Sequence, residues 1–482
     1  MCPSDFLVSA GRRAFVSLAL TVAVLASSAG LWAATPNVLF SDGAVLQQGR
    51  PVPVWGTGDD GEEVTISIQD KSATATTADG RWMAWLPPLE AGGPFELTIK
   101  GNNETKVGDV LVGEVWIASG QSNMQWPLNR TVDSEATIAA ANNPQLRLFS
   151  VPLKYSDKPE TTVDAKWQLC TPETVPGFSA VGYFFGQHLQ ERLGVPVGVI
   201  NTSYGGTPAE NWTSREKLAS VPETRHYVGE GGSDKASGLY NAMIAPLVPY
   251  AIEGAIWYQG ESNAGRAWEY YTLFPAMIED WRDKWGQGSF PFLFVQLAPF
   301  KAITQEPTES DWAELRDAQR NTTLVVPQTA EAVITDVGDE NDIHPQNKKP
   351  VGDRLALAAR ALAYGENVVY SGPDYAAIDI AGDTATIHFD HVGTGLAIRD
   401  NDGNPQETLS GFTICGPDRV FHNAEAQLSG NTVTVRCDAV THPVAVRYGW
   451  ANYPLGNLWN ADGLPASPFR TDDFPLTTAP QE

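Results

Sequence analysis

The sequence has few cysteines, few basic residues and no long apolar run, and each shortage excludes a class of protein. Its 482 residues include 4 cysteines, without a Cys-x-x-Cys or Cys/His spacing that suggests zinc. Lysine and arginine number 32 against 57 acidic residues, and the net charge of -25 argues against nucleic acid or an anionic membrane as a partner. We therefore expect no metal, no cofactor and no membrane span, and no segment indicates an obligate protein partner.

The amino terminus has the residue order of a cleavable export signal. Arg12 and Arg13 precede an apolar segment, residues 14–26, which small residues follow. This segment is too short to span a bilayer. Residues 1–34 are therefore predicted to be a signal peptide of either the secretory or the twin-arginine type. The protein is accordingly predicted to be exported, to the periplasm or the extracellular space.

Loss of that signal would remove Cys2 and leave three cysteines. An oxidising compartment permits one disulfide, and Cys415 with Cys437, on two nearby strand-like segments, is the candidate pair. Whether this pair forms stays open at the level of sequence. Cys170 is expected to be a free, buried thiol in that case.

The hydrophobic periodicity changes twice along the chain. Residues 35–107 and residues 371–482 alternate apolar and polar side chains between turn residues, which predicts two β modules. Residues 108–370 alternate strand-like and helix-like segments, which predicts an α/β domain with a parallel sheet between helices. The strands expected there are 110–119, 197–203, 255–259, 290–297 and 332–336, and the helices are 181–193, 239–247, 271–285 and 350–364.

The loops after these strands contain the residue types that ester hydrolysis requires. Parallel strands meet at one sheet edge, and the stretch Glu114–Leu128 (EVWIASGQSNMQWPL) presents Ser122 there after a glycine turn. His344 follows the fifth strand, with Asp342 two residues before it. In an extended loop these two side chains project the same way, so the carboxylate can orient Nδ1 and leave Nε2 for the serine. Any one Gly-x-Ser is more often a turn or a helix cap.

Gly-x-Ser-Asn occurs twice, so two serines compete as nucleophile. Glu261 would place a carboxylate beside an alkoxide forming on Ser262, whereas Gln121 beside Ser122 is neutral. This difference favours Ser122. Gln121 and Glu261, together with Gln259, are also candidates for substrate binding.

Two further residues are candidates for stabilising an oxyanion. Asn263 can offer its side-chain amide, and Gly206 a backbone N–H that no Cβ obstructs. Each also has an ordinary structural explanation, since Gly206 suits a turn and Asn263 a helix cap. Only the combination of these loops favours a catalytic role over these structural explanations.

The loop sequences resemble the successive blocks of the sialate O-acetylesterase family within the SGNH hydrolases: VWIASGQSNM, NTSYGGTPAENW, WYQGESN and DIHPQNKKPVGDRLA. Two flanking segments resemble that family's β modules, LFSDGAVLQQGRPVPVWG and VRYGWANYPLGNLWNADGLPASPFRTD. The resemblance covers nearly the whole mature chain. It implies a flavodoxin-like SGNH hydrolase domain, with a β-sandwich-like module on each side, that removes acetyl groups from sugars.

The resemblance also implies roles for individual residues. Ser122 corresponds to the nucleophile and His344 to the base, while Gly206 and Asn263 complete an oxyanion hole with the backbone amide of Ser122. The general SGNH pattern has an aspartate three residues before the histidine, where this chain has asparagine. Asp342 is the acid that matches relatives with Asp-x-His.

The implied substrate is an acetylated carbohydrate, either O-acetyl sialic acid or an acetylated plant polysaccharide such as xylan or xyloglucan. The charge of -25 slightly favours a neutral glycan. The alternative function is a carbohydrate-binding protein with a vestigial esterase site, which the β modules and 15 tryptophans favour. A protease or lipase of the α/β-hydrolase type requires Gly-x-Ser-x-Gly, and Met124 and Ala264 stand where its last glycine belongs.

Overall fold

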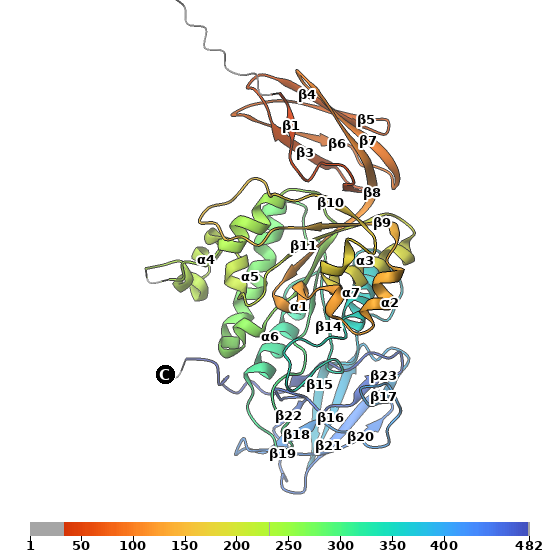
Figure 1. The fold of residues 1–482 in the computed structure, drawn as a ribbon. Helices are drawn as coiled ribbons and strands as arrows, with labels where there is room; N and C mark the ends of the chain where they lie inside the picture. Colours follow the sequence, from red (N-terminus) through yellow and green to blue (C-terminus); the bar gives the residue numbers. More distant parts are fainter. Residues whose placement is uncertain (1–32, 231, 481–482) are drawn as a thin grey trace, which may run out of the picture.

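The computed structural model describes residues 33–230 and 232–480, arranged as three regions along the length of the molecule (Figure 1). β-Strands from the first part of the chain form one end, a sheet with helices forms the middle, and strands from the last part form the other end. The predicted signal peptide lies almost wholly outside the described residues, so export stays a prediction. None of the helices in the described ranges is long and apolar enough to cross a membrane.

A mixed sheet forms the middle of the molecule. Its main path has the order β10-β9-β11-β8-β12-β13-β14, and every neighbouring pair is parallel except β10 with β9. The strands are β8 (Glu104–Gly120), β9 (Asn143–Ser150), β10 (Trp167–Cys170), β11 (Val197–Ser203), β12 (Gly254–Tyr258), β13 (Phe292–Val295) and β14 (Thr329–Ala332).

The parallel strands predicted from the sequence are present, with one displaced. β14 pairs with β13 from Thr329, opposite Phe292, to Ala332, opposite Val295, where β13 ends. β14 therefore ends at Ala332, where the predicted segment 332–336 begins. β9 was not predicted, because the polar Arg147 interrupts its apolar run. That guanidinium is buried and forms an ion pair with Asp109, at 2.8 Å between Nη1 and Oδ2.

Helices cover both faces of the central sheet. α3 (Ala180–Leu193) packs against α7 (Lys349–Leu362), and α5 (Ala267–Trp285) packs against α6 (Asp311–Val325). Alternate side chains of β8 divide between the two cores: Trp116 lies in the core that α3 and α7 cover, and Ile117 in the core that α5 and α6 cover. A strand that is buried on both faces has a continuous apolar sequence, as residues 115–118 of β8 do.

Two helical segments differ from prediction. Residues 239–247 form a π turn (Tyr240–Ile244) and a 3-10 turn (Ala245–Leu247) instead of one α-helix, and Pro246 has no N–H with which to continue the ladder. α6 was not predicted, because buried charged residues such as Arg316 conceal its apolar face. The remaining short helices are α1 (Ser122–Gln125), α2 (Ser134–Ala140), α4 (Arg215–Ser220), η1 (Leu128–Arg130), η2 (Val175–Gly177), η3 (Ala209–Trp212), η4 (Pro222–Tyr227) and η7 (Glu261–Arg266).

β8 belongs to the first region as well as to the middle. Its first half pairs with β7 and β2, and its second half lies between β11 and β12. The boundary predicted after residue 107 therefore falls within one continuous strand. The first region contains β1 (Thr35–Pro36), β2 (Val45–Gln47), β3 (Val52–Thr57), β4 (Glu63–Ile68), β5 (Lys71–Thr76), β6 (Arg81–Leu86) and β7 (Gly92–Lys100).

The third region has a separate apolar core and is again all β. Its largest sheets have the orders β15-β16-β21-β20 and β19-β18-β22-β24. Cys415 lies in the second of these sheets and Cys437 follows the first; both are free thiols, as is Cys170. The strands are β15 (Asp374–Ala381), β16 (Thr384–Asp390), β17 (Leu396–Ile398), β18 (Phe412–Cys415), β19 (Phe421–Asn423), β20 (Glu425–Ser429), β21 (Thr432–Arg436), β22 (Ala445–Tyr448), β23 (Leu458–Asn460) and β24 (Phe469–Arg470).

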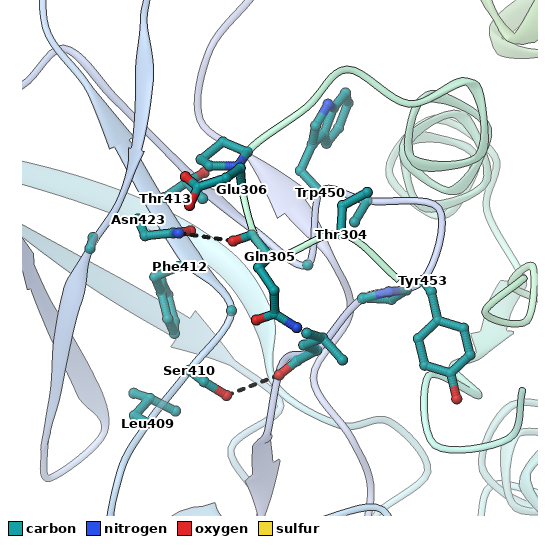
Figure 2. A pocket seen from close by; sticks show the side chains of 17 residues that line it. Thr304, Gln305, Glu306, Leu409, Ser410, Phe412, Thr413, Asn423, Trp450 and Tyr453 are labelled. Atoms are coloured by element: carbon teal, nitrogen blue, oxygen red, sulfur yellow. Dashed lines mark hydrogen bonds between the residues drawn. The ribbon is translucent and has the colours of Figure 1, made fainter. Parts of the chain in front are cut away.

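A loop of the middle region docks on this third region around a cavity of about 280 Å³ (Figure 2). Figure 2 shows Gln305 extending into the cavity, and the Asn423 side chain donates to the backbone oxygen of Gln305 at 2.9 Å. Across the cavity, the Ser410 hydroxyl donates to the backbone oxygen of Leu455, also at 2.9 Å. The cavity is therefore a seam between two regions of the molecule.

Candidate active site

The site residues named in the sequence analysis lie at the carboxyl end of β8. Ser122 begins α1 directly after that strand, Gly206 follows β11, and Asn263 follows β12. His344 lies in the loop between β14 and α7. After β8 the chain adds strands on one side of it, β9 to β11, and then on the other side, β12 to β14. Such a reversal is a topological switch point, where open α/β sheets form their ligand-binding crevice.

A glycine turn delivers Ser122 to this position. Gly120 has φ +133°, and a Cβ built on it would lie 2.2 Å from the backbone oxygen of Tyr258 in β12. No other residue fits, because the clash is with backbone and not with a movable side chain. The N–H of Gln121 then donates to that same oxygen at 2.9 Å, which ties the turn to β12.

Ser122 and His344 are in hydrogen-bond contact. Nε2 of His344 lies 2.9 Å from Oγ of Ser122. The imidazole stacks on the indole of Trp126, with ring centroids 4.9 Å apart and planes at 17°. The stacking partner comes from the Ser122 loop, so the geometry of the pair is set partly by the residues that follow the serine.

Asp342 lies beside His344 but bonds most directly to its backbone. Oδ1 accepts from the His344 N–H at 2.9 Å and lies 3.4 Å from Nδ1. Burial lowers the pKa of His344 below its usual value, the carboxylate of Asp342 opposes that shift, and the charge of Lys348 adds to it. Lower pKa means that the imidazole is neutral, and able to accept a proton, over a wider range of pH.

The two Gly-x-Ser-Asn motifs bond to each other. The Gln121 side-chain oxygen accepts from the backbone N–H of Ser262 at 3.3 Å. The Asn123 side chain donates to Glu261 at 2.6 Å and to the backbone oxygen of Ile343 at 2.9 Å. The second motif therefore braces the first, and Asn123 links both to the loop that carries His344.

Asn263 is buried, with its side-chain amide held on both sides. Its Oδ1 accepts from the Ala209 N–H at 3.0 Å and from Nε2 of Gln259 at 2.7 Å, while its Nδ2 donates to Glu210 at 3.2 Å. In the loop after β11, Gly206 has φ +73°. Its neighbour Gly205 packs so closely on Ser122 that a Cβ there would lie 3.2 Å from the serine Cβ.

The three candidates for substrate binding turn inward. Gln121 and Gln259 are 3% and 0% exposed. The amide of Gln259 is fully engaged, because it also donates to Thr207 and accepts from the Tyr270 hydroxyl at 2.8 Å. One carboxylate oxygen of Glu261 bonds to Asn123 and the other is buried, and this burial raises the pKa of Glu261. The structure thus places all three beneath the site.

Sequence reasoning missed three residues of the site: Asn123, Trp126 and Lys348. Lys348 is fully buried, its ammonium donates to Asn123, and burial lowers its pKa to about 7. A lysine four positions after the histidine gives no signal of burial, because a lysine before a helix is normally solvent-exposed. For Asn123 a signal existed, since the asparagine recurs with the serine in both motifs.

Comparison with known proteins assigns the chain to a family. Residues 112–361 match the family model described as carbohydrate esterase, sialic acid-specific acetylesterase, and this range includes every site residue above. The chain belongs to this family. The esterase is 32% identical to the sialate O-acetylesterase of Homo sapiens over 92% of its own chain and 93% of the human protein. It is 30% identical to that of Mus musculus, over 93% and 96% of the two chains.

A solved structure agrees. The esterase resembles the crystal structure of a carbohydrate acetylesterase from Xanthomonas citri, with a TM-score of 0.85 and 44% identity over 92% of this chain and 100% of that chain. The esterase is therefore a carboxylic-ester hydrolase that acts on carbohydrate, and the family expected from its sequence is confirmed. Its mixed α/β fold with additional β-sheet regions is likewise confirmed.

Proposed function

We propose that the esterase removes acetyl groups from sugars through an acyl-enzyme on Ser122, in a flavodoxin-like domain of the SGNH type. The observation that carries the proposal is the 2.9 Å contact between Nε2 of His344 and Oγ of Ser122. The five strands expected from the sequence have the spatial order 2-1-3-4-5, the flavodoxin-like order, which supports the domain type. The division into modules at 35–107, 108–370 and 371–482 belongs to the same proposal.

The reaction follows from this contact. Ser122 attacks the acetyl carbonyl while His344 takes the Oγ proton, and the same imidazole returns that proton to the departing sugar hydroxyl. Water, deprotonated by His344, then releases acetate from the serine. The N–H groups of Ser122 and Gly206 and the amide of Asn263 stabilise the oxyanion of both tetrahedral intermediates.

Asp342 orients the imidazole in this proposal. Its carboxylate holds the backbone of His344 and lies 3.4 Å from Nδ1, which favours the tautomer with a free Nε2 lone pair. The side chain of Asp342 is 43% exposed, so we assign it a smaller contribution than a buried triad aspartate makes.

Gln121 and Gln259 are buried, and the carboxylate of the half-buried Glu261 turns inward, which favours a supporting role for all three. Gln259 holds Asn263, and Gln121 and Glu261 brace the Ser122 loop. Contact with the sugar is then left to groups at the rim of the site. The net charge of -25 favours a neutral acetylated glycan over O-acetyl sialic acid, and acetate release from acetyl-xylan, acetyl-xyloglucan and O-acetyl sialic acid decides between them.

Two serine variants test the mechanism. Ser122→Ala is expected to lower kcat for p-nitrophenyl acetate by at least ~1,000-fold, because the nucleophile is lost. Ser262→Ala is the matched control in the second motif, and we expect it to keep most of the activity. The proposal is wrong if Ser122→Ala retains hydrolysis and Ser262→Ala abolishes it.

The alternative function, a carbohydrate-binding protein with a vestigial site, makes a different prediction. A fluorophosphonate labels an activated serine covalently, whereas a binding protein does not react. We expect one label per chain, located on Ser122 by mass spectrometry. An unlabelled protein that still binds glycan would favour the alternative.

A further inference from the structure

The amide of Asn263 has one orientation only. Its Oδ1 accepts from two N–H donors, those of Ala209 and Gln259. A flipped amide would place its NH₂ group against both donors, so hydrogen bonding excludes the flipped state. Nδ2 therefore points away from Gln259, and it has two hydrogens to donate.

Glu210 accepts one of these hydrogens. The Asn263 Nδ2 to Glu210 Oε2 distance is 3.2 Å, and Glu210 is 4% exposed. The second hydrogen of Nδ2 is the one that the proposed function assigns to the oxyanion. A buried carboxylate on the same nitrogen creates a difficulty, because its negative charge repels the charge that develops on the substrate.

Arg266 removes that difficulty. Its Nη2 lies 2.6 Å from Oε1 of Glu210, so the carboxylate accepts from Asn263 with one oxygen and from a guanidinium with the other. Arg266 and Asn263 are three residues apart in η7, where side chains at i and i+3 share a face. Glu210 comes from η3, in the loop after β11, so the cluster also joins the loop that contains Gly206 to the one that contains Asn263.

We propose that Glu210 and Arg266 are positioning residues for the oxyanion donor: Glu210 aims the amide of Asn263, and Arg266 cancels the charge that Glu210 brings there. This inference rests on the proposed function. It predicts that the charge of Glu210 is harmful on its own and harmless when paired. A role in folding alone predicts this pattern in melting temperature but not in the kcat of folded enzyme.

Charge-paired variants test the idea through kcat and KM for p-nitrophenyl acetate. Arg266→Met leaves Glu210 unpaired, and we expect kcat to fall at least ~10-fold with little change in KM, because the oxyanion exists only in the transition state. Arg266→Lys keeps the charge and is expected to retain at least about a third of kcat. The double variant Glu210→Gln with Arg266→Met has neither charge, and we expect it to be more active than Arg266→Met alone.

Glu269→Gln is the matched control. Glu269 is the second carboxylate on Arg266, at 2.9 Å from Nη1, and it does not contact Asn263. We expect its kcat to stay within about two-fold of the parent, since the oxyanion donor is untouched. Melting temperatures of all variants show whether each is folded.

The outcomes separate this inference from the proposed function. If Asn263→Ala keeps full kcat, the oxyanion role of that residue in the proposed function is wrong, and the inference with it. If Asn263→Ala loses at least ~100-fold in kcat while Arg266→Met loses less than ~10-fold, only the positioning role is wrong. A double variant no more active than Arg266→Met also overturns charge cancellation. Should Arg266→Met fail to fold, the double variant is compared with Arg266→Lys: near-equal kcat supports the inference, and a loss above ~10-fold contradicts it.

Discussion

At the residue scale, the proposed chemistry depends on a neutral His344. Burial lowers the pKa of this imidazole, and Asp342 only partly opposes the shift. Protonated imidazole cannot accept the Ser122 proton, so activity is lost as pH falls through the folded-state pKa. We therefore expect kcat/KM to rise with pH along a limb whose midpoint lies below 6.5, the usual value for histidine.

Lys348→Met tests the electrostatics at this scale. Lys348 has a pKa of about 7, so it is charged where His344 titrates, and its charge disfavours the imidazolium. Removing it is expected to raise the pKa of His344 and move the acid limb to higher pH. The free energy of unfolding should also fall by about 3 kcal/mol, because Glu261 loses its nearby charge partner. A pH–rate profile measures the shift of the acid limb, and urea unfolding measures the change in free energy.

The neighbouring lysine supplies the control for that experiment. Lys349 is 63% exposed and pairs with Asp353 on the surface of α7. Lys349→Met should leave the acid limb in place and change stability by less than ~0.5 kcal/mol. An equal shift of the limb in both variants would show that bulk charge, and not the buried ammonium, is responsible.

At the scale of elements, the turn between β8 and α1 decides where Ser122 lies. Its geometry depends on Gly120, which packs directly against the backbone of β12. α1 itself is only four residues long. The motif after β12 then bonds back to the motif after β8 through Gln121 and Asn123. The two strand ends therefore act as one structural unit.

Gly120→Ala is expected to break this unit. The added Cβ would meet the Tyr258 oxygen at 2.2 Å in a backbone conformation that alanine disfavours, so β8 or β12 has to move. We expect a loss of at least ~2 kcal/mol in unfolding free energy and a large loss of kcat. Gly177→Ala, whose Cβ meets nothing within 4 Å, is the control and should be near neutral. Full activity in Gly120→Ala would contradict the assigned turn geometry.

At the scale of the whole molecule, Arg316 joins the middle region to the third region. This guanidinium is fully buried in α6 and donates to four backbone oxygens, those of Leu297 and Ala298 in the middle region and those of Ala451 and Asn452 in the third. Leu297 and Ala298 belong to the loop after β13. The next residue in that loop, Pro299, packs against Gly338 in the loop that contains His344. The third region thus supports the site from outside.

Arg316→Met should therefore destabilise the molecule more than an ordinary surface arginine does. The carbonyl oxygens of Leu297 and Ala451 lose their donor, whereas those of Ala298 and Asn452 keep one from other N–H groups. We expect about 3–5 kcal/mol less unfolding free energy. Arg436→Met is the control, because Arg436 is 50% exposed in its pair with Glu425 and should contribute less than ~1 kcal/mol. Urea unfolding compares the two, and an equal effect would show that Arg316 does not join the regions.

The sequence alone predicted the alternation of strands and helices, the family, and the meeting of Ser122, Gly206, Asn263 and His344 at one sheet edge. These inferences are local, since an apolar run ending in glycine marks a strand end wherever it lies in the chain. α6 and β9 escaped prediction because buried ion pairs and hydrogen bonds stand in for apolar packing there, as with Arg147 and Asp109.

Only the tertiary structure decided what the polar side chains around the site do. Gln259 and the carboxylate of Glu261 turn inward, Lys348 is buried, and Glu210 contacts Asn263. The partners in these contacts lie tens to hundreds of positions apart in the sequence. Such contacts leave no periodicity in the sequence, because a polar residue has the same letter whether it faces solvent or a buried partner. Motif and order determined which residues lie at the strand ends, and packing determined which of their side chains turn inward beneath the site.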